Sequence, residues 1–188
     1  VKYTYIEYAR FADDIVILVD GFGKWKWLLK AAYKRLLQEL EKLGVKLNIQ
    51  KTQIVDLTRG QTFGFLGFVF RRIKNRQGGW GLRIVPRMKA RKALLQNLKE
   101  VFRRHKSQPI RQVIDLINPI LRGWVNYFRI GNSASCFGYI KDWVEKKIRR
   151  HLMRARKRHG FGWNRWSKAW FYNTLGLYGD YRIRYYQA

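Results

Sequence analysis

The apolar positions near the N-terminus fall into two short β-prone runs, residues 3–12 and 15–19, and the break between them is Asp13 and Asp14. Two such runs around a short polar break predict an antiparallel hairpin. The two aspartates have two possible explanations. Aspartate is common in turns because its side chain bonds nearby backbone groups. Two ionised carboxylates also supply the oxygen ligands that suit Mg²⁺. Taken alone, the pair favours the turn.

A helical pattern follows the hairpin. Apolar residues recur at steps of three and four from Trp25 to Leu43, and Gly44 follows as a stop signal. This spacing predicts an amphipathic helix whose apolar stripe is core and packs against a sheet. Residues 45–57 then predict a strand pair or a strand and a turn, and residues 62–72 predict another strand.

A second hairpin is expected before the composition changes. Gln77, Gly78 and Gly79 mark a turn between the apolar run 68–70 and the run 80–85, and Pro86 ends the latter. The order of hairpin, helix and further strands predicts an α+β fold with an antiparallel sheet.

The chain beyond Pro86 has a helical period. Helices are predicted from Met88 to His105, from Pro109 onward, and over 137–159. Asn118 followed by Pro119 reads as a new helix cap with proline at the first helical position, so we expect the second helix to break or kink there.

Composition and charge narrow the functional classes. The chain has 188 residues, 47% of them hydrophobic, which favours a folded protein. Its formal net charge of +28 attracts polyanions, so nucleic acid is the leading partner and an anionic membrane surface the second. No apolar run approaches the roughly 20 residues that span a bilayer.

The single cysteine, Cys136, excludes an internal disulfide framework and a multi-cysteine zinc site, and we expect it to be a buried small hydrophobe. His105, His151 and His159 lie among lysines and arginines, which predicts a solvated basic face instead of metal ligands. A reducing, intracellular compartment fits this composition, either the bacterial cytoplasm or an organelle.

The third predicted helix carries an unusual excess of positive charge. Residues 146–158 contain eight lysines and arginines, and the acids close by are Asp142 and Glu145. Such unpaired charge predicts contacts with phosphates. The candidate nucleic-acid-binding residues are Lys146, Lys147, Arg149, Arg150 and Arg154. Aromatic residues between 161 and 172 either stack on unpaired RNA bases or form a small core, and the sequence leaves both open.

Four motifs occur in a suggestive order: YARFADD at residues 8–14, LNIQKT at 47–52, FLGF at 65–68 and LINPILRGWVNYF at 116–128. Together they resemble the C-terminal half of a group II intron-encoded reverse transcriptase, also called a maturase. The first is similar to the Y-A-D-D palm motif of that family, with Phe11 where tyrosine is usual. The last is similar to the start of the maturase-specific X, or thumb, domain and narrows the resemblance to this family.

The resemblance implies a division of the chain. Residues 1–86 would be the C-terminal part of a polymerase palm, an antiparallel sheet with a packed helix, and residues 87–188 an all-α thumb or X domain. It also implies RNA-directed DNA polymerase activity, a nucleotidyl transfer, together with intron splicing, with group II intron RNA and a primer-template as partners.

Individual residues take roles from the same resemblance. Asp13 and Asp14 would be catalytic ligands of Mg²⁺ in a two-metal phosphoryl transfer. Phe11 would pack beside the primer-template, Lys51 would lie near the incoming nucleotide or the primer phosphate, and Gly67 would allow close approach of the nucleic-acid backbone.

The departures from the family pattern matter equally. The fingers and the first palm aspartate would lie upstream of Val1. Asp20 follows Asp14 by six residues of strand, about 20 Å, which is too far to share a metal. We therefore expect no primer extension by this chain without a polypeptide carrying the upstream palm and fingers. An RNA-binding splicing cofactor that does not polymerise is the alternative function, and a general basic RNA-binding protein is a third.

Overall fold

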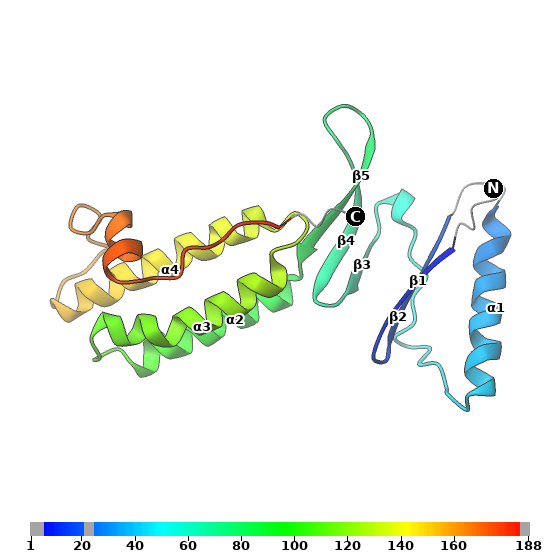
Figure 1. Ribbon diagram of the computed structural model, residues 1–188, viewed down its shortest axis with the longest axis horizontal. Coiled ribbons are helices and arrows are strands. Elements are labelled where there is room, and N and C mark those ends of the chain that lie inside the picture. The colour runs from blue at the N-terminus through cyan, green and yellow to red at the C-terminus, as the bar shows by residue number, and fades with distance from the viewer. Residues whose placement is uncertain (1–5, 21–24, 185–188) are drawn as a thin grey trace. The chain divides into compact units, whose positions relative to one another are not determined.

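The computed structural model describes residues 6–20 and 25–184 and combines antiparallel sheets with helices, which confirms the predicted α+β class (Figure 1). Two compact units make up the chain, Val1–Gln61 and Thr62–Ala188. Among the described residues, no helix is both long enough and apolar enough to cross a membrane.

The predicted hairpin of the first unit is confirmed. Strand β1 (Ile6–Phe11) pairs with β2 (Asp14–Val19) in antiparallel register, with Phe11 opposite Asp14. Ala12 and Asp13 therefore form a two-residue loop. Ala12 has a φ of 50°, the left-handed conformation that tight hairpin loops require at one or both of their central positions.

Helix α1 (Lys26–Lys42) occupies the segment predicted to be helical, but the prediction that its stripe forms a core is wrong. None of its side chains is buried. The side that is least exposed is only half-buried and consists of Leu28, Ala32, Leu36 and Leu40. A two-stranded hairpin offers too little apolar surface to cover a helix face, because a stable sheet core needs three or more strands.

Residues 45–57, all of them described, contain no strand, so this prediction is also wrong. The Asn48 carbonyl accepts hydrogen bonds from the amides of Lys51 (3.1 Å) and Thr52 (3.0 Å), which curls the chain into a turn. Asp56 accepts a bond from the Thr58 amide (2.9 Å) and caps a short 3₁₀ helix, η2 (Leu57–Arg59). The Asn48 side-chain oxygen also accepts from the Lys51 amide (3.2 Å), so Asn48 and Asp56 satisfy backbone amides locally and replace a strand ladder.

The second unit begins with an antiparallel sheet in the order β3 (Thr62–Phe65), β4 (Phe68–Lys74) and β5 (Trp80–Pro86). The single strand predicted over residues 62–72 is in fact β3 and most of β4. They are separated by a turn at Leu66–Gly67, whose φ angles are 47° and 75°. The predicted glycine turn between β4 and β5 is confirmed.

Three long helices follow, as predicted: α2 (Met88–Arg104), α3 (Ile110–Phe128) and α4 (Ala134–Ala155). A single π-helical turn, η3 (Trp170–Thr174), precedes the extended C-terminal segment. In Figure 1 this segment, coloured red, runs back along α4.

Of the break or kink predicted at Asn118 and Pro119, the break does not occur, because α3 continues through Pro119, and a kink there stays a prediction. The Asn118 side chain donates to the Gly176 carbonyl (2.8 Å) and accepts from the Tyr178 amide (2.8 Å). It therefore anchors the C-terminal segment instead of capping a helix. Leu121, just beyond the proline, is completely buried, so packing holds the helix together despite the missing backbone hydrogen bond.

The core of the second unit has two parts. The larger lies among the three helices and the C-terminal segment and includes Cys136, which is buried as predicted. The smaller joins the sheet to the helices through Phe68, Val125, Phe128 and Phe137. By packing, the three-stranded sheet belongs with the helices, although the sequence motifs assign it to the palm. The motif-based boundary after Pro86 stays a prediction.

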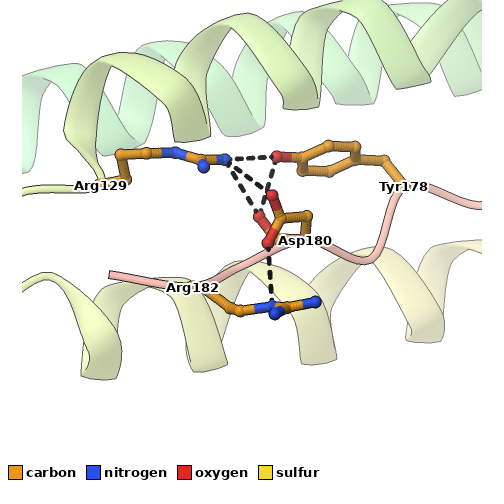
Figure 2. A network of polar contacts seen from close by, with 4 residues as sticks. All are labelled: Arg129, Tyr178, Asp180 and Arg182. Carbon is orange, nitrogen blue, oxygen red and sulfur yellow. Dashed lines mark hydrogen bonds and ion pairs between the residues drawn. The ribbon is translucent and has the colours of Figure 1, made fainter. Parts of the chain in front are cut away.

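A polar network fixes the C-terminal segment to the end of α3 (Figure 2). The buried guanidinium of Arg129 donates to the Tyr178 hydroxyl (3.1 Å) and to a carboxylate oxygen of Asp180 (3.2 Å). Arg182 forms an ion pair with the second carboxylate oxygen of Asp180 (3.4 Å). The Arg184 amide donates to the Arg129 carbonyl (2.8 Å), which completes the network.

Candidate nucleic-acid interface

The two aspartates lie at the tip of the first hairpin, as the sequence predicted. Asp13 is in the loop, Asp14 is the first residue of β2, and both are exposed. The Arg10 side chain donates to the Ala12 carbonyl (2.9 Å) and holds the loop. Phe11 beside them is 62% exposed. The tip therefore presents two carboxylates and an aromatic ring to solvent.

This arrangement offers part of a metal site. Within the described residues, no three potential ligands from histidine, cysteine, aspartate and glutamate come together. Mg²⁺ is commonly held by one or two carboxylates together with waters and substrate phosphates, so the pair fits one side of such a site. A two-metal clamp needs at least one further carboxylate.

The other residues expected near a primer-template lie in turns. Lys51 is exposed in the turn that Asn48 organises, in the same unit as the aspartates. Gly67 belongs to the second unit, in the turn between β3 and β4, and a Cβ there would come within 3.3 Å of the Phe128 ring. The turn and this close packing explain why glycine is needed. The nucleic-acid contacts predicted for Lys51 and Gly67 stay predictions.

The structure corrects the prediction for Arg149. Its side chain is only 2% exposed and points into the helical unit. The guanidinium donates to the Gly162 carbonyl (3.3 Å) and lies over the rings of Trp163 (4.7 Å) and Phe171 (4.6 Å). Burial lowers the pKa of this guanidinium. Arg149 therefore supports the fold and is not placed to contact phosphates.

Three of the predicted cations remain on an accessible surface that we call the α4 basic patch, consisting of Lys147, Arg150 and Arg154. Within the described part of the chain, none of them forms an ion pair. Burial, followed by the positive charges of Arg150, Lys99 and Arg154, lowers the pKa of the Lys147 ammonium. The charges of the patch are thus close enough to repel one another, and a polyanion would relieve this repulsion.

The acids of α4 are already engaged. Asp142 forms an ion pair with Lys146 (2.7 Å), so this predicted phosphate contact has a partner within the protein. Glu145 is buried, accepts from the Tyr172 hydroxyl (2.7 Å) and lies 3.6 Å from the Lys168 ammonium. Neither carboxylate therefore neutralises the α4 basic patch.

A groove between α2 and α4 adds residues that the sequence reasoning missed. Its lining consists of Lys89, Lys92, Ala93, Leu95, Gln96, Lys99 and Trp143. The signal was present in the sequence, because positions 89, 92, 96 and 99 follow one another at helical spacing and carry no acid.

Two further expectations are decided by burial. His151 is 7% exposed and its Nε2 lies 2.9 Å from the Gln108 carbonyl, so the predicted solvated environment is wrong for this histidine. Trp166 and Phe171 are core residues, whereas Trp163 is 52% exposed. Core formation therefore accounts for the most buried aromatics of the C-terminal region, and the alternative of base stacking remains open for the exposed one.

Comparison with known families agrees with this geometry. Residues 91–170, which include α3, α4 and most of α2, match the family described as group II intron, maturase-specific domain. No curated protein matches the chain significantly. The matched helices are thus of a kind associated with intron splicing. The match supports the prediction from the motifs that this part of the chain is similar to the C-terminal region of a group II intron maturase.

Proposed function

We propose that this chain binds group II intron RNA through its helical unit and assists intron splicing as a maturase. The observation that carries the proposal is the α4 basic patch, three neighbouring cations without acidic partners inside the matched domain. Lysine and arginine bind RNA mainly by neutralising phosphates and releasing counterions. An intron must bring its own phosphates together to fold, so a rigid cationic surface favours the compact RNA.

The dependence of RNA affinity on salt tests this proposal. Replacing Lys147, Arg150 and Arg154 by glutamine removes up to three phosphate contacts. Each contact contributes roughly 0.7 to the slope of log affinity against log salt, so the slope should fall by up to about 2. The assay is filter binding of a structured group II intron RNA to the whole chain between 50 and 300 mM KCl, accompanied by a splicing assay at low magnesium.

A matched variant controls for the loss of net charge. Lys26, Lys30 and Lys34 are exposed on α1 and form no ion pair within the described residues, so replacing them by glutamine removes the same charge elsewhere. Affinity and slope should change much less in this control. Equal effects of the two variants on affinity and slope would mean that the α4 basic patch binds RNA no better than other lysines do. Unchanged RNA binding in the α4 variant would refute the proposal.

We further propose a second function, supported by the exposed aspartate pair at the hairpin tip. Asp13 and Asp14 would hold Mg²⁺ for RNA-directed DNA synthesis when a third carboxylate is supplied by an upstream palm segment. Phe11, Lys51 and Gly67 would then lie along the primer-template. The chain as given should not extend a primer, and primer extension should depend on adding the palm and fingers in trans.

A further inference from the structure

The groove between α2 and α4 combines apolar and cationic side chains. Ala93, Leu95 and Trp143 provide apolar surface, the remaining lining residues are three lysines and Gln96, and none of the seven is acidic. Trp143 is half-buried and packs partly against the main core. An open groove of this kind suits a ligand that has flat apolar faces and negative charges.

The charges around the groove extend onto α4. The Lys147 ammonium lies 5.1 Å from the centre of the Trp143 ring, and Lys147 is close enough to Lys99 for repulsion between the two ammonium groups to lower its pKa. Glu100, which follows Lys99, is occupied by an ion pair with Arg103 (2.8 Å). The groove and the α4 basic patch therefore form one continuous cationic surface with a tryptophan within it.

The spacing along α2 sets the length of the ligand. Lys89, Lys92 and Lys99 span ten residues of helix, which at 1.5 Å per residue is about 15 Å. Stacked nucleotides advance about 3.4 Å each along one strand, so this span corresponds to about four nucleotides. Gln96, between the outer lysines, carries an amide that can donate to and accept from a base edge.

We propose that this groove binds an unpaired segment of RNA about four nucleotides long, with one base on the ring of Trp143 and phosphates at the lysines. The inference rests on the proposed RNA-binding function and adds the form of RNA that is recognised. A duplex keeps its bases stacked on one another, so it cannot use the tryptophan. An unpaired base can, and stacking on an aromatic side chain tolerates any of the four bases.

Substitutions at Trp143 test the inference with the whole chain and two probes, an eight-nucleotide single-stranded oligouridine and a blunt RNA duplex of eight base pairs. Trp143→Leu should weaken binding of the single strand about tenfold, which lies within the roughly five- to hundredfold contribution of a stacked base. Binding of the duplex should change less than twofold. Trp143→Phe keeps a ring and should restore most of the affinity.

Trp80 provides the matched control. It is 53% exposed on β5, outside the groove, and the Arg72 guanidinium lies 4.2 Å from its ring centre. Trp80→Leu should leave the affinity for the single strand within twofold of the parent. Thermal melting verifies that the variants are folded. Photocrosslinking of 5-bromouridine oligonucleotides to the unsubstituted chain gives a second measurement, and peptides from residues 89–99 or 143–147 should carry the crosslink.

The outcomes separate the two proposals. Single-strand affinity that is unaffected by Trp143→Leu, an equal loss for strand and duplex, or crosslinks confined to other peptides would overturn the groove as an RNA site while RNA binding itself stands. A parent chain that binds neither probe nor intron RNA at low salt would overturn the proposed function as well.

Discussion

Two adjacent arginines on α4 should respond very differently to the same substitution. Arg149 is 2% exposed, whereas its neighbour Arg150 is exposed and lies with its guanidinium 4.6 Å from the Phe161 ring centre. In Arg149→Glu, a carboxylate would enter the core one helical turn from the buried Glu145, and the contacts with Trp163, Phe171 and the Gly162 carbonyl would be lost. In Arg150→Glu, the new carboxylate would lie in water.

The magnitude follows from burial. Removing one partner from a buried charged cluster costs about 3–5 kcal/mol of unfolding free energy, since the remaining charge is left uncompensated. For a protein of this size each kcal/mol lowers Tm by roughly 2–4 °C, so Arg149→Glu should lower Tm by about 10 °C. Arg150→Glu should change the unfolding free energy by less than about 0.5 kcal/mol, as is usual for surface substitutions.

Arg149→Met separates the electrostatic part from the packing part. Methionine keeps much of the volume and introduces no second carboxylate beside Glu145, so its cost should be smaller, about 1–2 kcal/mol for one hydrogen bond and the ring contacts. The measurements are thermal and urea unfolding followed by circular dichroism at 222 nm. Equal stability of Arg149→Glu and Arg150→Glu would refute the reasoning, and so would a methionine variant as unstable as the glutamate one.

Three further results are expected. Replacing both Asp13 and Asp14 by asparagine should abolish weak Mg²⁺ binding measured by calorimetry, and binding that persists would place the metal elsewhere. Asp180→Asn removes the anionic partner of the buried Arg129, so urea unfolding should show a loss of about 1–3 kcal/mol and faster proteolysis of the C-terminal segment; unchanged values would mean that the network contributes nothing. Burial raises the pKa of the Cys136 thiol, so less thiolate is present at pH 8, and its reaction with a disulfide reagent should be slow until guanidinium unfolds the chain. Rapid reaction in the native state would contradict this burial.

The sequence by itself determined the parts of the fold that depend on neighbouring residues. The aspartate hairpin, the glycine turn after β4 and the positions of α1, α2 and α4 follow from periodicity and turn chemistry, which act within a few residues. The four motifs also predicted a relationship to the maturases, and the family match over residues 91–170, which include the last motif, agrees with it. The excess of positive charge in residues 146–158 predicted a nucleic-acid surface on α4, but not which of its cations are exposed.

Side-chain burial was decided by tertiary structure. Arg149 and Arg150 have the same chemistry and adjacent positions, yet their directions differ by about 100° around the helix axis, and only the placement of the C-terminal aromatics shows which one is covered. On α1, the regular apolar period predicted a buried stripe, but the stripe is not buried. A buried face needs a second surface that covers it, and periodicity does not supply one.

The sequence also could not show whether a polar side chain bonds a nearby backbone group or a distant one. Asn118 has the local chemistry of a helix cap, but the backbone of residues 176 and 178 satisfies its side chain, and α3 therefore continues through Pro119. The groove at Trp143 likewise depends on residues that are distant in the sequence. Its lysines come from α2 and its tryptophan from α4, 44 to 54 residues further along the chain, and packing of the two helices brings them together. Local preferences act over a few residues, whereas burial and shared sites depend on which distant surfaces meet.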